Sequence, residues 1–181
     1  MSLHQILFLI CFAINILPGS TLVLPRTNST SACGKISVVF TGLPPFHPLV
    51  AAQGFNSSQV NAGLRNDAAD ILAAGYNLKV VLMGPEIPIE ILKAESSDRS
   101  YDGAGIGFGV RGSNSLNMTI RMEQILQTFR ETNPNAPVVL DQSPVTGIDA
   151  VKRRFPLQSN CANSPGQNLG FDVICNICGT Q

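Results

Sequence analysis

Two short segments hold the side chains that could carry chemistry. One is a glycine-rich stretch, Asp102–Gly112, in which Arg111 is the only cation; the other is the loop that contains His47. A histidine can act as a general acid or base near neutral pH, and an arginine can clamp a carboxylate or phosphate. Two plainer alternatives stay open. The histidine could be a solvated loop residue, and the arginine could pair with an acid such as Glu86 or Asp141.

The glycine-rich stretch also contains a G-x-G-x-x-G pattern at Gly107, Gly109 and Gly112. This pattern binds dinucleotides when it follows the first strand of a βαβ unit and an acid lies about 20 residues further on. Here it follows the third predicted strand, and Asp141 lies 29 residues beyond Gly112. We therefore expect no dinucleotide and no other cofactor.

Glycines at positions 103, 105, 107 and 109 fall on one face of the predicted third strand. Glycine weakens a strand, so something should approach this face closely, either a docked helix or a ligand lying against the backbone. The sequence contains no G-x-S-x-G elbow and no H-E-x-x-H or other metal-ligand spacing.

Hydrophobic periodicity predicts the elements that position these residues. Strands are expected at 36–41, 78–83, 101–110 and 138–141, and helices at 58–74, 88–96, 114–131 and 143–155. Residues 171–175 could add an edge strand. Strictly alternating strands and helices predict an α/β three-layer sandwich, with a four- to five-stranded, mainly parallel sheet in the flavodoxin-like order 2-1-3-4.

The helix ends carry their own signals. Ser57 or Ser58 can cap the first long helix, Gly75 can end it in a left-handed conformation, and Ser143-Pro144 can open the last helix. In the helix at 114–131, the positions expected to be buried are Met118, Met122, Ile125, Leu126 and Phe129. The positions expected on its exposed face are Asn117, Arg121, Gln124 and Thr128.

In such a sheet, ligands bind beyond the carboxyl ends of the strands, where the strand order reverses. For the order 2-1-3-4, that crevice lies between the first and third strands, at the loops 41–48 and 107–114. The candidate ligand-binding residues are therefore Gly42, His47, Gly107, Gly109 and Arg111.

The first 20 residues have the character of a secretory signal peptide. An apolar run from Ile6 to Leu17, interrupted only by Asn15, precedes Pro18 and two small residues. It is too short to span a bilayer, although its n-region lacks Lys and Arg. A membrane anchor and a buried N-terminal helix are the alternatives.

Two further features agree with export. Asn28, Asn56 and Asn117 each begin an N-x-[ST] glycosylation motif, although any one of them could be an ordinary loop residue. Beyond the signal, an even number of cysteines remains, which predicts two disulfides with three possible pairings: Cys33, Cys161, Cys175 and Cys178. We expect Cys33, which precedes the first strand, to bridge to the tail at the amino edge of the sheet. A redox or metal-binding role for the C-x-x-C pair is the alternative.

These features divide the chain into a signal at 1–20, a flexible leader at 21–34, an α/β domain at 35–155 and a cysteine-containing tail at 156–181. The chain carries 12 basic and 12 acidic residues, so nothing in its charge favours nucleic acid or an acidic membrane as a partner. After cleavage of the signal, no stable membrane insertion is expected.

The segment Tyr101–Arg111 resembles a "YD…IG.GVR" motif of small, uncharacterised α/β proteins of bacteria and fungi. The similarity also includes Gly63-Leu64, residues 74–77 and residues 150–153, and it extends over roughly 36–155. It implies the α/β topology and singles out Arg111, but it implies no catalytic role. The cysteine tail departs from the short cytoplasmic form of that group.

Three functions are compatible with these patterns. The first is a secreted protein that binds a small anionic or polar ligand at the expected crevice. The second is a secreted effector or pathway-accessory protein without a reactive site. The third is an enzyme in which His47 is the acid-base residue and Arg111 is the anion clamp.

Overall fold

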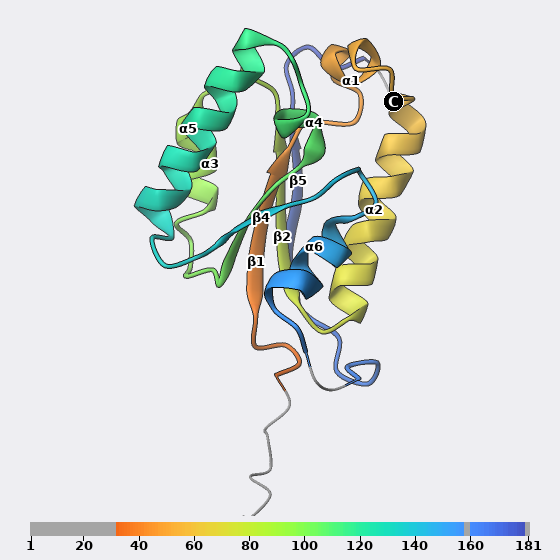
Figure 1. Cartoon of the computed structure of the whole chain (residues 1–181), viewed down its shortest axis with the longest axis vertical. Coiled ribbons are helices and arrows are strands. Elements are labelled where there is room, and N and C mark those ends of the chain that lie inside the picture. The colour runs from red at the N-terminus through yellow and green to blue at the C-terminus, as the bar shows by residue number, and fades with distance from the viewer. Residues whose placement is uncertain (1–31, 158–159, 180–181) are drawn as a thin grey trace, which may run out of the picture.

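Five parallel strands form a single sheet in the computed structural model, which describes residues 32–157 and 160–179 (Figure 1). The strands are β1 (Ser37–Gly42), β2 (Asn77–Met83), β3 (Gly103–Ile106), β4 (Val138–Leu140) and β5 (Asn168–Ile174). Their order is β4-β3-β1-β2-β5, and every neighbouring pair is parallel. The expected α/β class is confirmed. The full order differs from 2-1-3-4 because β5, from the predicted tail, pairs with β2 and adds a fifth strand.

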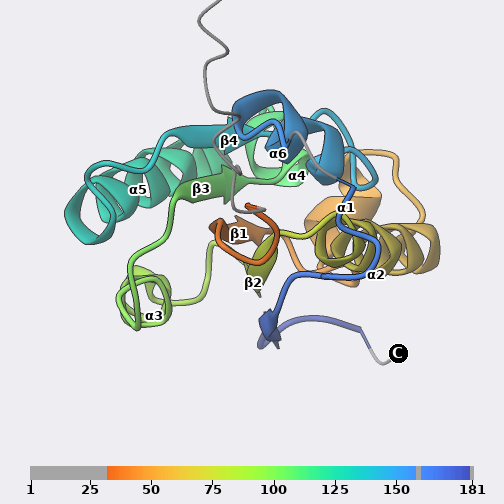
Figure 2. The same cartoon turned by 90° about the horizontal axis from the view of Figure 1, so that it is seen from below.

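Helices cover both faces of this sheet (Figure 2). They are α1 (Pro48–Ala52), α2 (Ser57–Ala73), α3 (Ile89–Glu95), α4 (Phe108–Arg111), α5 (Leu116–Thr132) and α6 (Gly147–Arg154). Side chains alternate along a strand, so neighbouring residues enter different cores. Val39 packs into the core on the α3 and α5 side, whereas Val38 and Phe40 pack into the core on the α2 and α6 side.

The first long helix begins and ends by different devices. Its cap is Asn56, whose Oδ1 accepts from the backbone N–H of Gln59 at 3.0 Å, and not Ser57 or Ser58 as expected. Gly75 follows the helix with φ +95°, so the predicted left-handed ending is confirmed.

The third strand is shorter than the expected 101–110. It ends at Ile106, because Gly107 becomes the N-cap of the four-residue helix α4. The amide of Gly107 still donates to the carbonyl of Thr41 in β1, at 2.8 Å, which keeps this turn against the sheet.

Aromatic rings fill the space above the glycines of β3. A Cβ on Gly105 would lie 2.3 Å from the ring of Phe40, and one on Gly103 would lie 2.6 Å from the ring of Phe155. Phe155 directly follows α6, so a docked helix, as one of the two alternatives expected, covers Gly103. At Gly105 the covering group is a side chain of β1.

Two residues of α5 are buried although the sequence pattern places them on the exposed face. Arg121 is 2% exposed and Thr128 is 5% exposed. Arg121 is covered because its guanidinium donates to the backbone carbonyls of Gly84 and Pro85, both at 2.9 Å, in the loop that follows β2. Asn117 and Gln124 are exposed as expected.

The last helix starts later than expected, at Gly147. Thr146 Oγ1 accepts from the amides of Gln142 and Ser143, both at 2.9 Å, and so holds the preceding residues in a turn. Pro144 therefore lies in this loop and not in the first helical turn.

Both predicted disulfides are present, and their pairing is now defined. Cys33 bonds Cys161 at the amino edge of the sheet, as expected, and Cys175 bonds Cys178 just beyond the end of β5. The predicted signal, most of the leader and Asn28 lie outside the described residues.

Candidate functional site

The main pocket lies at the carboxyl edge of the sheet, where the strand order reverses between β1 and β3. Thr41 and Gly42 at the end of β1 form part of its wall, together with Gly107 and Gly109 after β3. This is the position at which open α/β sheets bind ligands. The expected crevice is therefore a real pocket, and three of its expected residues, Gly42, Gly107 and Gly109, line it.

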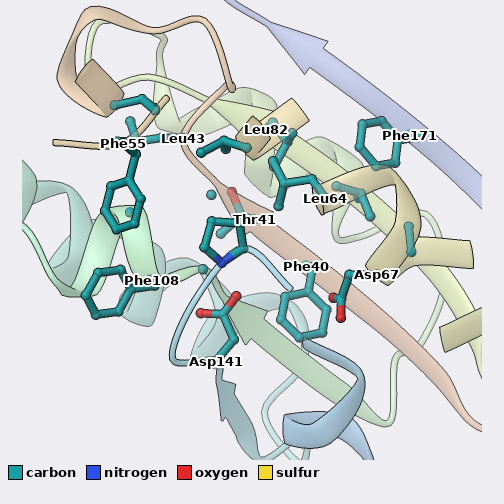
Figure 3. A pocket seen from close by; sticks show the side chains of 18 of the residues that line it. Phe40, Thr41, Leu43, Phe55, Leu64, Asp67, Leu82, Phe108, Asp141 and Phe171 are labelled. Atoms are coloured by element: carbon teal, nitrogen blue, oxygen red, sulfur yellow. The ribbon is translucent and has the colours of Figure 1, made fainter. Parts of the chain in front are cut away.

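Most of the remaining wall is apolar (Figure 3). Side chains from the α2 face of the sheet meet side chains from α2 and the neighbouring loops, among them Phe40, Leu43, Phe55, Leu64, Leu82, Phe108 and Phe171. The centres of water molecules can occupy about 70 Å³ of the pocket. One water needs about 10–15 Å³ on this measure, so the space suits a small organic molecule.

Asp141 brings a buried carboxyl group to this apolar wall. It directly follows β4 and is 6% exposed. Its Oδ1 has no hydrogen-bond partner, while the backbone N–H of Phe108 donates to the carboxylate. Burial raises the pKa of Asp141 to about 7, against the effect of the Phe108 N–H, and the negative charge of Asp67 raises it further.

Asp67, on α2, is the second carboxyl group of the pocket. Its Oδ1 accepts from the backbone N–H of Ile148 at 3.1 Å, and the N–H of Gly147 also donates to it. Burial raises the pKa of Asp67 to about 6, although these two N–H groups favour the ionised form. The carboxylate thus caps α6 and contributes negative charge to the pocket.

Gln53 supplies a neutral acceptor to the same wall. Its Nε2 donates to the carbonyl of Gly109 at 3.0 Å, and its Oε1 is buried without a partner. Together with Asp141 Oδ1, this makes two buried acceptors in one pocket that lack a donor. A buried polar atom without a partner is unfavourable by about 1–3 kcal/mol, so both atoms are matched to a donor that a ligand could bring.

Arg111 does not line the pocket, although the sequence places it at the crevice. Its guanidinium donates to the backbone carbonyl of Asp141 at 3.0 Å and lies 5.2 Å from the centre of the Phe108 ring. It therefore supports the turn after β4 from outside, and its side chain is exposed.

His47 lies elsewhere and has a structural role. Its Nδ1 accepts from the amide of Leu49 at 3.1 Å, which caps α1, and its Nε2 lies 3.0 Å from Glu86 Oε2. The ring is 2% exposed, so the side chain is not a solvated loop histidine. Since Nδ1 accepts, the ring proton is on Nε2 and points to Glu86.

His47 lines a second pocket together with Glu86 and Arg121. The centres of water molecules can occupy about 530 Å³ of this pocket. Arg111 does not line this pocket either. The structure therefore does not bring His47 and Arg111 into one site.

Asp67, Gln53 and Arg121 are site residues that the sequence analysis did not identify. Asp67 shares the inward helical stripe of Val60, Leu64 and Ile71, so an acid on an apolar face was the available signal. The sequence offers Asp141 as a partner for Arg111 or for a dinucleotide, but not as a residue of the pocket, although its place after a strand already puts it at the carboxyl edge.

Within residues 32–157 and 160–179, no three His, Cys, Asp or Glu side chains are grouped as a metal site would require. In the same residues, no helix is both long and apolar enough to span a bilayer. Comparison with protein families, characterised proteins and solved structures found no match for this chain.

Proposed function

We propose that this is a secreted, disulfide-stapled α/β protein that binds a small apolar ligand carrying hydrogen-bond donors, such as an amine or an alcohol, in the main pocket. The observation that carries this proposal is the pair of unpartnered acceptors, Asp141 Oδ1 and Gln53 Oε1, in an otherwise apolar wall. A ligand with one or two donors would satisfy both while filling the apolar space.

The charges favour this donor-bearing ligand over an anionic one. Asp67 and Asp141 both line the pocket, whereas the guanidinium of Arg111 is held outside it. An anionic ligand would add a further negative charge beside two carboxyl groups in a poorly solvated space, which is unfavourable.

Secretion is supported by three independent features. Two disulfides suit an oxidising compartment, and the segment 1–20 has the pattern of a signal peptide. Asn56 and Asn117 both have exposed side chains, as glycosylation requires.

The ligand proposal is tested with probes that share one ring and differ in one group: benzylamine, benzyl alcohol, toluene and benzoate. We expect benzylamine and benzyl alcohol to raise the melting temperature, and toluene and benzoate to raise it far less. The variants Asp141→Asn and Gln53→Met should weaken this effect, because each removes one free acceptor.

Asp149→Asn, on the exposed side of α6, is the matched control and should bind as the wild type does. A larger effect of benzoate than of benzylamine would contradict the proposal, as would unchanged binding of both probes by the two pocket variants.

Acid-base catalysis is a second proposal, favoured by the two carboxyl groups that share the pocket. Burial raises the pKa of Asp141 to about 7 and that of Asp67 to about 6, so both can exchange protons near neutral pH. Turnover of chromogenic glycosides or esters that Asp141→Asn abolishes even at saturating substrate would support it. Absence of turnover in the wild type would leave binding as the function.

A further inference from the structure

The second pocket is lined on one side by a single stripe of α5. Asn117, Ile120, Arg121 and Gln124 are spaced i, i+3, i+4 and i+7, so they lie on one helix face. The opposite wall includes Glu86 and the residues 47–49 at the start of α1. It also includes Ile177, from the loop that the Cys175–Cys178 disulfide closes.

Arg121 leaves hydrogen-bond donors unused in this wall. Its Nη2 is fully engaged by the carbonyls of Gly84, Pro85 and Ile87, but Nε and Nη1 are buried without a partner. Within the described part of the chain, no carboxylate oxygen lies within 4.0 Å of the guanidinium, since no ion pair involves Arg121. A buried cation with unused donors is matched to acceptors supplied from outside the domain.

Large apolar side chains are exposed around the same pocket. Ile120 is 43% exposed and Ile177 is 52% exposed, and both line it. Leu116, next to Asn117 in sequence, is 72% exposed. Two exposed apolar side chains in the wall of one hollow indicate a surface that something covers.

The structure indicates what could cover it, because a glycosylation motif forms part of the wall. Asn117 begins the motif Asn117-Met118-Thr119, its side chain is exposed, and it lines the pocket directly. A sugar attached there starts inside the rim, one helical turn from Arg121. A glycan on Asn117 would be held there covalently, so no separate partner would need to be recruited.

We propose that Asn117 carries an N-linked glycan whose first N-acetylglucosamine residues lie in the second pocket. Asn117 Nδ2 would form a bond to C1 of the first sugar. The bond from C1 to the phosphate oxygen of the sugar donor would break, the polyprenyl diphosphate would leave with the electron pair, and the amide would give up one proton. This inference rests on the proposed secretion, and it does not depend on the ligand of the main pocket.

The chemistry of the sugar fits both kinds of side chain in the wall. The acetamide carbonyl and the hydroxyl oxygens are acceptors for the Arg121 guanidinium, and the hydroxyl groups can donate to Glu86. The acetamide methyl group and the C–H face of the ring can cover Ile120 and Ile177. Arg121 Nε and Nη1 are covered in the structure, so a sugar reaches them only after neighbouring side chains move.

The test uses the full chain, expressed in a glycosylating eukaryotic host. Thr119→Ala and Asn117→Gln each remove this motif, and Ser58→Ala removes the motif at Asn56 as the matched control. We expect intact mass to show a glycan on Asn117. Its loss should lower the melting temperature by roughly 2–4 °C and increase the binding of an apolar dye, whereas loss of the Asn56 glycan should change neither. Nuclear Overhauser effects should connect the acetamide methyl group to the methyl groups of Ile120 and Ile177.

An unmodified Asn117 in molecules glycosylated at Asn56 would overturn the proposal. So would a glycan on Asn117 that shows no contact with Ile120 or Ile177. A second expression, in which an established signal peptide replaces residues 1–20, separates the two proposals. If only the version with the replacement signal is exported, the proposal that residues 1–20 are a signal peptide is refuted. The glycan measurements on that version still decide whether the second pocket holds the sugar.

Discussion

Asp67 caps a helix that lies far from it in sequence: its Oδ1 accepts from the backbone N–H of Ile148 at 3.1 Å, across 81 residues. A Cβ on Gly147 would lie 2.3 Å from Asp67 Oδ2, so glycine at this position lets the carboxylate approach the start of α6. The same carboxylate lines the main pocket. One side chain therefore joins α2 to α6 and supplies negative charge to the candidate site.

Removing this cap should destabilise the fold. We expect Asp67→Ala to lower the free energy of unfolding by about 1–2 kcal/mol, as loss of a helix cap does. Asp67→Asn keeps one acceptor oxygen and should lose less. Urea unfolding at pH 5, below the raised pKa of Asp67, measures both. Asp70→Ala, on the exposed side of the same helix, is the control and should change stability by less than about 0.5 kcal/mol. Equal losses for Asp67→Ala and Asp70→Ala would contradict the capping role.

Asp141 should make stability depend on pH. Its pKa in the folded protein, about 7, is above the ordinary value of 3.8, so the folded state binds the proton more tightly than the unfolded state. Its contribution to stability is therefore fully present below about pH 4 and is lost as the pH rises through 7. One pKa unit corresponds to about 1.4 kcal/mol, so the total change is a few kcal/mol.

Asp141→Asn removes this titration. We expect the variant to gain stability relative to the wild type as the pH rises from 4 to 8, measured as the difference in unfolding free energy at each pH. Asp67, whose pKa is also raised, should leave a smaller slope of the same sign in the variant. A difference that stays constant with pH would show that Asp141 is not the titrating group.

The two disulfides should differ in their contribution to stability. Cys33 and Cys161 are separated by 128 residues in sequence, whereas Cys175 and Cys178 are separated by 3. In the chain-entropy model, closing the longer loop stabilises by about 5 kcal/mol and closing the shorter one by about 2 kcal/mol. Denaturant unfolding of the two double serine variants tests this order. A larger loss of unfolding free energy for the double variant Cys175→Ser with Cys178→Ser would show that loop length does not determine how much each disulfide stabilises the fold.

Gly105 should affect binding in the main pocket, because a Cβ there would meet the ring of Phe40 at 2.3 Å, and Phe40 lines that pocket. We expect Gly105→Ala to displace this ring, reduce probe binding, and lower stability by roughly 1–3 kcal/mol. Gly103→Ala is the matched control, since its Cβ would meet Phe155, which does not line the pocket. Calorimetric titration with benzylamine should therefore separate the two variants. Equal binding by both would argue against a role for Phe40 in the pocket.

Much of the fold could be predicted from local patterns. The strands β1 and β2 could be predicted from their apolar runs, and the helix α2 from its apolar stripe. Both patterns can be read within a short window of sequence. The left-handed conformation of Gly75 could be predicted from its residue type and its place after the helix. The position of Cys33 just before β1 was enough to predict a disulfide at the amino edge of the sheet. The switch point between β1 and β3 followed from the topology, so the position of the main pocket was predictable as well.

The chemistry of the sites was not predictable in the same way. The helical pattern of α5 places Arg121 on the exposed face. That pattern holds no information about the carbonyls of Gly84 and Pro85, which lie in another loop and accept from its guanidinium. The sequence likewise predicts His47 as an acid-base candidate without showing that its ring nitrogens contact Leu49 and Glu86.

By itself, the sequence determined the alternation of strands and helices, the parallel sheet and the edge at which a ligand could bind. Only the tertiary structure decided that Asp67, Asp141 and Gln53 face that pocket, while His47 and Arg111 do not share a site. The physical reason is that the burial pattern of a helix or strand depends on residues close together in sequence. The partner of a polar side chain, in contrast, is a backbone or side-chain atom from a distant part of the chain.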